Sequence, residues 1–213
     1  MILAVILSFV VAYLLGSVNT SVIIGKLKGI DIRKKGSGNA GMTNTLRVVG
    51  KKAAVLVFIF DFLKTIIALI LSIVVAKVVI PESKDAVLYM QYVAGFGAVL
   101  GHNFPIYFGF KGGKGIVCSI AVILFLDWRI GLIIATVCIL IMIITKYVSL
   151  GSVVGAIIYP IFVIAFNPDF SQMTVRYYIA MSIVISLLAL YRHRANISRL
   201  LKGTESKIGQ KKN

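Results

Sequence analysis

Acidic residues are scarce in this sequence of 213 residues, which holds 7 Asp and Glu against 23 Lys and Arg. Residues of either charge make up only 14% of the chain, whereas 59% of it is hydrophobic. An ordinary soluble domain carries about 25% charged residues. The composition therefore excludes such a domain and indicates an integral membrane protein with an excess of positive charge.

Cysteine is also rare, since Cys118 and Cys138 are the only two in the sequence. They lie in separate apolar segments, and the chain contains neither a CxxC pair nor a cluster of cysteine and histidine. We therefore interpret both as small buried hydrophobic side chains rather than as a disulfide or a metal site. No metal and no cofactor is expected.

Seven apolar runs carry most of the hydrophobic residues, and none shows the period-2 alternation of a membrane barrel. We therefore predict an all-α integral membrane protein that forms a single domain over residues 1–213, with a polar tail from about 203. A straight spanning helix needs about 20 apolar residues, which the fourth run does not supply alone. The first run lacks a basic start, so we interpret it as a retained helix. The runs cover residues 1–25, 53–80, 87–107, 115–126, 130–145, 152–166 and 176–191.

The distribution of Lys and Arg favours seven crossings. With seven, segments 26–52, 108–114, 146–151 and 192–213 share one side of the membrane and hold 8, 2, 1 and 7 Lys and Arg. The opposite side holds only four, and six or eight crossings would separate the basic segments. Cytoplasmic loops carry an excess of Lys and Arg. The pattern therefore predicts an external N-terminus and a cytoplasmic C-terminus.

The segment GSGNAGMTN, residues 36–44, combines three glycines with polar side chains. It fits the pattern G-x-G-x-x-G, but no βαβ unit surrounds it, so we do not interpret it as a dinucleotide site. Gly36, Gly38 and Gly41 allow successive N–H groups to face one point and bind an anion. The alternative is a flexible loop beside anionic lipids. The side-chain donors expected here are Ser37, Asn39, Thr43, Asn44 and Arg47.

A second glycine-rich segment, GFKGGKG at residues 109–115, differs from a Walker A loop in its spacing and lacks the final Ser or Thr. ATP binding is therefore disfavoured. Its two lysines still lie among glycines that a phosphate can approach closely, and Gly115 opens an apolar helix whose N-terminal end favours anions. The candidate residues are Lys111, Gly112, Gly113 and Lys114.

No paired acid–base residues are recognisable around the two histidines. His102 lies in GHNFP and His193 in YRHR, and the residue five positions after each is Tyr107 or Ser198 rather than an acid. The absence of a His–Asp pair argues against a soluble-type acyltransferase. A histidine at the membrane interface is the structural alternative for His102.

Further polar residues accompany the apolar runs. Asp61 and Lys64 are spaced i, i+3 and share one helix face, either as functional groups or as a structural ion pair. Ser149 and Ser152 flank Leu150-Gly151 between two runs, a weak pattern because serines commonly cap helices. A basic extension over residues 191–205 contains Asn196, and it also suits a simple positive anchor on the cytoplasmic side.

Together these motifs resemble one family, the bacterial membrane glycerol-3-phosphate acyltransferases that use acyl phosphate as donor. The resemblance runs nearly end to end, with Met42 and Gly151 standing where alanine is expected. Its motifs are AYLLGS (12–17), GSGNAGMTN (36–44), DFLK (61–64), GHNFPIYFGFKGGKG (101–115), YVSLGS (147–152) and YRHRANISRLLKGTE (191–205).

The resemblance implies seven helices in the bacterial inner membrane and an active site that faces the cytoplasm. It implies transfer of a fatty acyl group from acyl phosphate to the 1-hydroxyl of glycerol 3-phosphate, with lysophosphatidic acid and phosphate as products. Membrane lipids are expected partners and nucleic acid is not, while the oligomeric state is left open. The implied catalytic residues are Ser37, His102, Lys114 and Asn196. The implied phosphate-binding residues are Gly36, Gly38, Asn39, Arg47, Lys111, Gly112, Gly113, Ser149, Ser152 and His193.

Two alternatives come from other classes of protein. An organic-phosphate or anion transporter would also use basic, glycine-rich loops on one side, although seven crossings without a repeat suit alternating access poorly. A structural protein that binds anionic lipids would leave the serines and asparagines of the motifs without a role.

Overall fold

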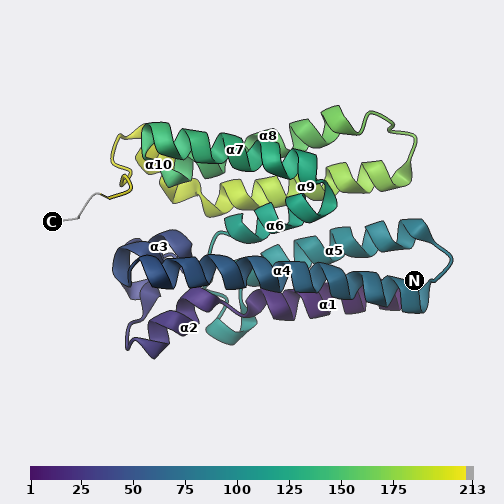
Figure 1. The fold of residues 1–213 in the computed structure, drawn as a ribbon, viewed down its shortest axis with the longest axis horizontal. Coiled ribbons are helices and arrows are strands. Elements are labelled where there is room, and N and C mark those ends of the chain that lie inside the picture. Colours follow the sequence, from purple (N-terminus) through teal and green to yellow (C-terminus); the bar gives the residue numbers. More distant parts are fainter. Residues whose placement is uncertain (210–213) are drawn as a thin grey trace. The chain divides into compact units, whose positions relative to one another are not determined.

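The computed structural model describes residues 1–209, and its regular elements are all helical over that range (Figure 1). The all-α prediction is therefore confirmed. The chain divides into two compact units, Met1–Leu126 and Asp127–Asn213. The first unit contains α1 Ile2–Ser17, α2 Thr20–Leu27, α3 Met42–Val48, α4 Lys51–Val79, α5 Lys84–Asn103 and α6 Ile116–Leu126, with 3-10 turns η1 Ile32–Lys34 and η2 Ile106–Phe108.

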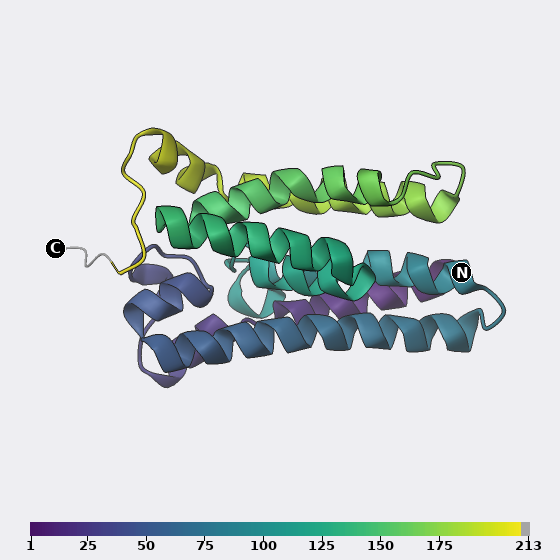
Figure 2. The same ribbon diagram turned by 45° about the horizontal axis from the view of Figure 1, so that its top comes forward.

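Helices α1, α4 and α5 form the core of the first unit and run side by side (Figure 2). Glycines allow α1 and α5 to approach closely. A Cβ on Gly97 would lie 2.9 Å from the Phe9 carbonyl, and a Cβ on Gly16 or Gly101 would overlap the backbone of the facing helix. Small residues are the usual means of tight helix contact in membranes.

The first apolar run is not one continuous helix, as the prediction over 1–25 implied. It breaks between α1 and α2, where the Asn19 Oδ1 accepts a hydrogen bond from the Val22 N–H at 3.0 Å and caps α2. In an unbroken helix that N–H would bond to the Val18 carbonyl. The break therefore leaves the Val18 carbonyl available to another donor, and the Lys64 ammonium of α4 donates to it.

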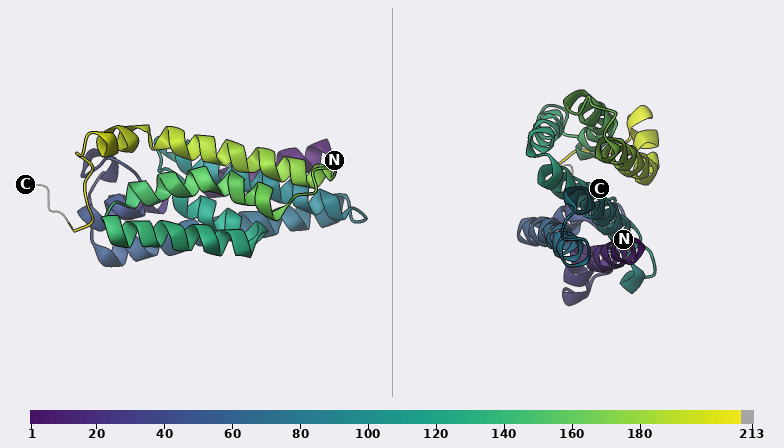
Figure 3. Two further views of the ribbon diagram at one scale, coloured as in Figure 1. Left: turned by 90° about the horizontal axis from the view of Figure 1, so that it is seen from above. Right: turned by 90° about the vertical axis from the view of Figure 1, so that its right-hand side faces the viewer.

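The second unit contains α7 Trp128–Thr145, α8 Val148–Phe166, α9 Met173–Arg192 and α10 Arg194–Leu201. Helix α8 packs against both α7 and α9, and the end-on view in Figure 3 shows their axes nearly aligned. The Ile208 N–H donates to the Lys146 carbonyl at 2.9 Å, which ties the segment after α10 to the turn between α7 and α8. The basic segments around residues 146–151 and 192–208 therefore lie at the same end of this unit.

Within residues 1–209, five segments are long and apolar enough to cross a membrane: Ile2–Leu27, Lys51–Val79, Trp128–Thr145, Val148–Phe166 and Met173–Arg192. Large apolar side chains point outward along them, and Phe60, Ile143 and Leu187 are each more than half exposed. Such a surface suits lipid rather than water. Helix α6 has 11 residues, as short as the sequence predicted.

Candidate active site

The GSGNAG segment of the first unit is folded around the side chain of Asn44. Its Oδ1 accepts a hydrogen bond from the Ser37 N–H at 2.8 Å, and its Nδ2 donates to the carbonyls of Ile32 and Lys35, each at 3.0 Å. Gly36 adopts a φ of 61°, and a Cβ there would overlap the Asn44 Oδ1. Asn44, expected to donate to a ligand, instead shapes the loop, and this argues against a merely flexible segment.

The remaining polar residues of this segment are accessible. Ser37 is exposed, Asn39 is half-buried, and Arg47 is exposed in the last turn of α3. This short helix separates the glycine-rich segment from α4. The left-handed φ of Gly50, 116°, permits the sharp change of direction between the two helices.

Hydrogen bonds to backbone carbonyls connect the second glycine-rich segment, and the residues just before it, to the rest of the first unit. Tyr13 donates from its hydroxyl to the Phe104 carbonyl at 2.8 Å, and the Arg33 guanidinium donates to the Phe108 carbonyl at 3.0 Å. The Gly113 N–H donates to the His102 carbonyl at 3.1 Å. Lys111 is exposed and Lys114 is half-buried. The next residue, Gly115, has a φ of 78° and lies directly before α6.

The two glycine-rich segments meet at His102. This side chain lies in the last turn of α5 and is buried, with 4% of its surface exposed. A Cβ on Gly113 would overlap the His102 Nε2 and lie 2.7 Å from the Ala40 carbonyl. The structure thus brings together His102, the GSGNAG segment and Gly113, three features that the motifs had grouped.

Asp61 and Lys64 form a buried ion pair on α4, with 2.7 Å between the Lys64 Nζ and the Asp61 Oδ1. The Lys64 Nζ also lies 2.7 Å from the Val18 carbonyl and 3.2 Å from the His102 Nδ1. An acid therefore does neighbour His102, which the sequence spacing could not reveal. However, the Asp61 Oδ2 is 3.7 Å from the Nδ1, so the two do not form a His–Asp hydrogen bond.

In the second unit, the Glu205 carboxylate gathers residues from two motifs. Its Oε1 accepts hydrogen bonds from the Ser149 hydroxyl at 2.8 Å and the Asn196 Nδ2 at 2.6 Å, and its Oε2 accepts from the Arg199 Nε at 2.7 Å. Burial opposes ionisation of Glu205, but these hydrogen bonds outweigh it and hold the pKa of that carboxyl below its usual value. Glu205 closes the last motif, KGTE, yet sequence reasoning did not select it.

The other candidates of the second unit are buried as well. Ser149 and Ser152 lie in the first turns of α8 and not between helices, and the Ser152 hydroxyl donates to the Val148 carbonyl at 3.0 Å. His193 is 3% exposed, with its Nδ1 2.8 Å from the Ala189 carbonyl, and stands between α9 and α10. Asn196 is 7% exposed.

No group of three His, Cys, Asp or Glu side chains in residues 1–209 could hold a metal ion. The polar groups of the two glycine-rich segments and their surroundings consist mainly of amides, hydroxyls and the cations of Lys and Arg. These are donors that suit phosphate oxygens. Apolar helices that carry such donors at their polar ends define a membrane protein suited to bind phosphorylated substrates.

The chain belongs to the glycerol-3-phosphate acyltransferase family, whose sequence profile matches residues 6–203. The glycerol-3-phosphate acyltransferase of Shouchella clausii is 43% identical over 212 residues, which cover 99% of each chain. That of Clostridioides difficile is 46% identical over 204 residues, which cover 95% of each chain. The resemblance inferred from the motifs is thereby confirmed.

Two solved structures of PlsY (YgiH), an integral membrane glycerol 3-phosphate acyltransferase, share this fold. The glycerol 3-phosphate form gives a TM-score of 0.81 and covers 96% of both chains. The lysophosphatidic acid form gives 0.78 and covers 96% of this chain and 95% of that one. Both are 38% identical to this chain. The prediction of a multi-pass, all-helical membrane protein is therefore confirmed.

Proposed function

We propose that this protein transfers a fatty acyl group from acyl phosphate to the 1-hydroxyl of glycerol 3-phosphate and releases lysophosphatidic acid and inorganic phosphate. The observation that carries the proposal is the meeting at the buried His102 of two glycine-rich segments, one of which bears Lys111 and Lys114. The membership of the chain in the glycerol-3-phosphate acyltransferase family supports the acceptor.

The chemistry of an acyl phosphate suits these residues. It is a mixed anhydride with phosphate as leaving group, so its carbonyl carbon needs no further activation. The protein has to hold two phosphate groups that repel each other and to stabilise the oxyanion that forms when the hydroxyl attacks. We assign these tasks to Lys111, Lys114 and Arg47, beside the glycine-rich backbone at Gly36 and Gly112. The N–H groups of Gly38 and Gly113 already donate to the carbonyls of Lys35 and His102, so they do not form the anion-binding nest that the sequence predicted.

The hydroxyl and amide side chains complete the assignment. From the resemblance of their motifs to the family, we propose that Ser37, Asn39, His193 and Asn196 hold substrate oxygens, with Ser37, His102, Lys114 and Asn196 nearest the reacting atoms. The hydroxyls of Ser149 and Ser152, predicted to bind phosphate, already donate to Glu205 and to the Val148 carbonyl. The hydroxyl proton would pass to a phosphate oxygen of the acceptor. No carboxylate then has to serve as the base, which agrees with the distance between Asp61 and His102.

The donor is tested with purified protein, glycerol 3-phosphate, and either palmitoyl phosphate or palmitoyl-CoA at equal concentration. We expect one phosphate released per acyl group transferred from palmitoyl phosphate and negligible transfer from palmitoyl-CoA. The short segment 108–114 offers little room for the adenosine and pantetheine of coenzyme A. Comparable rates would contradict the donor, and no transfer from either donor by folded protein would favour the transporter.

Arg47→Ala is expected to lower kcat/KM for glycerol 3-phosphate at least about tenfold, because hydrogen bonds to a charged group contribute roughly 1.5–3 kcal/mol. Lysine should restore activity only in part, since it lacks the planar fork of arginine. Steady-state kinetics measure the effect, with Lys51→Ala as a control that removes an exposed charge from the same basic segment. Unchanged kinetics in folded Arg47→Ala protein would contradict the assignment.

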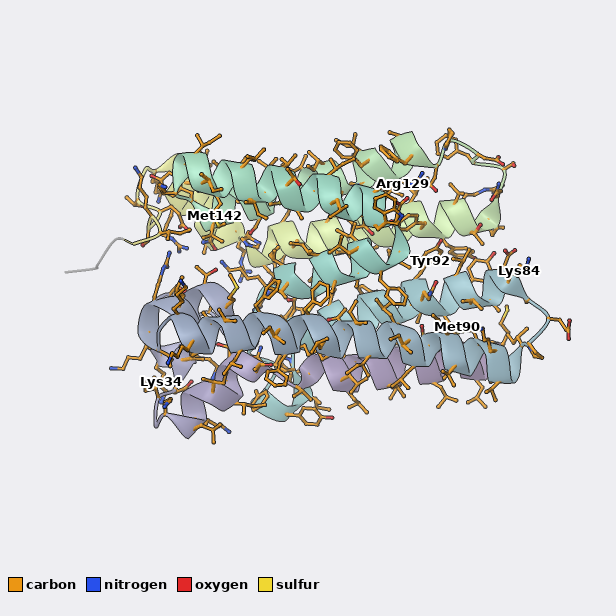
Figure 4. The ribbon with its side chains drawn as sticks, viewed as in Figure 1. Lys34, Lys84, Met90, Tyr92, Arg129 and Met142 are labelled. Atoms are coloured by element: carbon orange, nitrogen blue, oxygen red, sulfur yellow. The ribbon has the colours of Figure 1, made fainter. Side chains whose placement is uncertain are left out.

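We propose seven crossings, in which α5 and α6 join the five segments named above, with an external N-terminus and a cytoplasmic active site in a bacterial inner membrane. Lys34 belongs to the basic segment 26–52, and Lys84 belongs to the side that holds only four Lys and Arg. The two residues lie at opposite ends of the first unit (Figure 4). This separation supports the proposal, because positively charged loops remain in the cytoplasm. We further propose that the chain functions as one membrane domain.

Single cysteines at Ser37, Ser83 and Lys207 test this topology in a background without Cys118 and Cys138. We expect a membrane-impermeant thiol reagent to label the cysteine at position 83 from outside, and those at 37 and 207 only from the cytoplasmic side. Labelling of positions 83 and 207 from the same side would exclude seven crossings.

A further inference from the structure

A buried polar cluster in the first unit includes His102, and its other members have no role in the chemistry assigned so far. We call it the Lys64 cluster; it consists of Thr20, Asp61, Lys64, His102 and the Val18 carbonyl. Asp61 is 1% exposed, Lys64 8% and His102 4%. Ionisable groups buried this deeply in a membrane protein are costly, and they are generally retained for a function.

Every hydrogen of the Lys64 ammonium has an acceptor. An ammonium carries three N–H donors and no acceptor. The three atoms within hydrogen-bond distance of the Lys64 Nζ are the Asp61 Oδ1 at 2.7 Å, the Val18 carbonyl at 2.7 Å and the His102 Nδ1 at 3.2 Å. The His102 Nδ1 must therefore accept, which means that it carries no hydrogen of its own.

Other protonation states leave a conflict in this cluster. A hydrogen on the His102 Nδ1 would point at the Lys64 ammonium, and the Asp61 Oδ2 at 3.7 Å is too distant to accept it well. A neutral Lys64 could accept that hydrogen, but an amine is a much stronger base than an imidazole, and the Asp61 carboxylate would lose its counter-ion. Thr20 adds a neutral contact, with its hydroxyl 3.2 Å from the Asp61 Oδ1.

The other ring nitrogen of His102 faces the proposed reaction site. A Cβ on Gly113 would overlap the His102 Nε2, so that nitrogen lies directly against the second glycine-rich segment and beside the Ala40 carbonyl of the first. A neutral imidazole with no hydrogen on Nδ1 carries its hydrogen on Nε2. His102 therefore presents a hydrogen-bond donor, and no free lone pair, to that region.

We propose that Lys64 is a positioning residue that holds His102 neutral with its hydrogen on Nε2, so that the imidazole presents an N–H donor toward the two glycine-rich segments and does not act as the base. The role in catalysis rests on the proposed acyl transfer, whereas the tautomer does not. Asp61 contributes by keeping Lys64 charged and oriented. The hydroxyl proton then has to leave by another route, such as a phosphate oxygen.

The tautomer of His102 can be measured by spectroscopy, without an activity assay. The signals are simple to assign because the chain contains only two histidines. Protein labelled with ¹⁵N-histidine is examined by NMR at pH 7.5, and the His193→Asn variant assigns the two sets of signals. We expect an unprotonated, pyridine-type Nδ1 and a protonated Nε2 at His102 in the wild-type protein. A hydrogen on Nδ1, alone or together with one on Nε2, would overturn the proposal.

Two substitutions at Lys64 test the positioning role. In Lys64→Met, Asp61 loses its ammonium partner, and we expect the hydrogen to move to the Nδ1 and kcat to fall at least about tenfold. Lys64→Gln keeps an N–H donor, so it should retain the wild-type tautomer and more activity. The control is Lys77→Met, the same change at an exposed position of the same helix, which should keep the wild-type spectrum and kcat.

The outcomes separate the two proposals. Folded Lys64→Met protein with the wild-type tautomer and kcat would overturn the positioning role. If Lys64→Met does not fold, the wild-type spectrum still decides the tautomer, and Lys64→Gln decides the role. A wild-type protein that shows the expected tautomer but transfers no acyl group would refute the proposed function and leave the tautomer assignment intact.

Discussion

Replacing Lys114 with alanine is expected to lower kcat for acyl transfer from palmitoyl phosphate by about a hundredfold or more. Lys114 is half-buried directly before Gly115 and the start of α6. Its ammonium would neutralise the leaving phosphate and stabilise the oxyanion at the carbonyl carbon. The loss of one donor aimed at an oxyanion costs about 10²–10³ in kcat. Phosphate release from purified protein, at saturating concentrations of both substrates, measures the effect.

The matched control is Lys34→Ala, which removes the same charge from an exposed position in the first unit (Figure 4). We expect this control to retain wild-type kcat, because Lys34 belongs to neither glycine-rich segment. A loss that is equal in both variants would mean that net positive charge matters and not the position of Lys114. Thermal unfolding in detergent should be similar for the two proteins.

Replacing Gly113 with alanine is expected to lower kcat/KM by about a hundredfold, because a displacement of about 1 Å in a catalytic group can cost that much. Its φ lies outside the left-handed region, so the substitution tests space alone. The new Cβ would overlap the His102 Nε2 and lie 2.7 Å from the Ala40 carbonyl. Neither neighbour can yield easily, since Lys64 contacts the imidazole and the Asn19 Nδ2 donates to the Ala40 carbonyl at 3.2 Å.

Gly109→Asn is the control for this prediction. Gly109 begins the same segment and has a φ of 64°, a conformation that asparagine tolerates, and no atom lies within 4 Å of the position of its Cβ. We expect it to retain activity within a few-fold of wild type. Activity of Gly113→Ala comparable to that of Gly109→Asn would show that the contact with His102 has no part in catalysis.

The sequence alone determined the class of the protein, most of its helices and its family. Apolar runs separated by basic segments are local patterns, and the helices α4, α7 and α9 follow them within a few residues. The motifs determined the resemblance, because long strings such as GSGNAGMTN and GHNFPIYFGFKGGKG are specific without any knowledge of contacts. The short fourth run was likewise recognised as too short to cross a straight bilayer, and α6 has 11 residues.

Only the tertiary structure decided which polar groups meet. The break at Val18 and Asn19 exposes a carbonyl that Lys64 contacts from 46 residues away, and Ser149 reaches Glu205 across 56 residues. Neither contact could be predicted, because hydropathy and motif spacing describe neighbours along the chain. In an apolar interior each buried donor must find an acceptor, and that acceptor can lie on any helix that packing brings close. The environments of His102 and Glu205 therefore follow from the packing of each unit and not from local sequence.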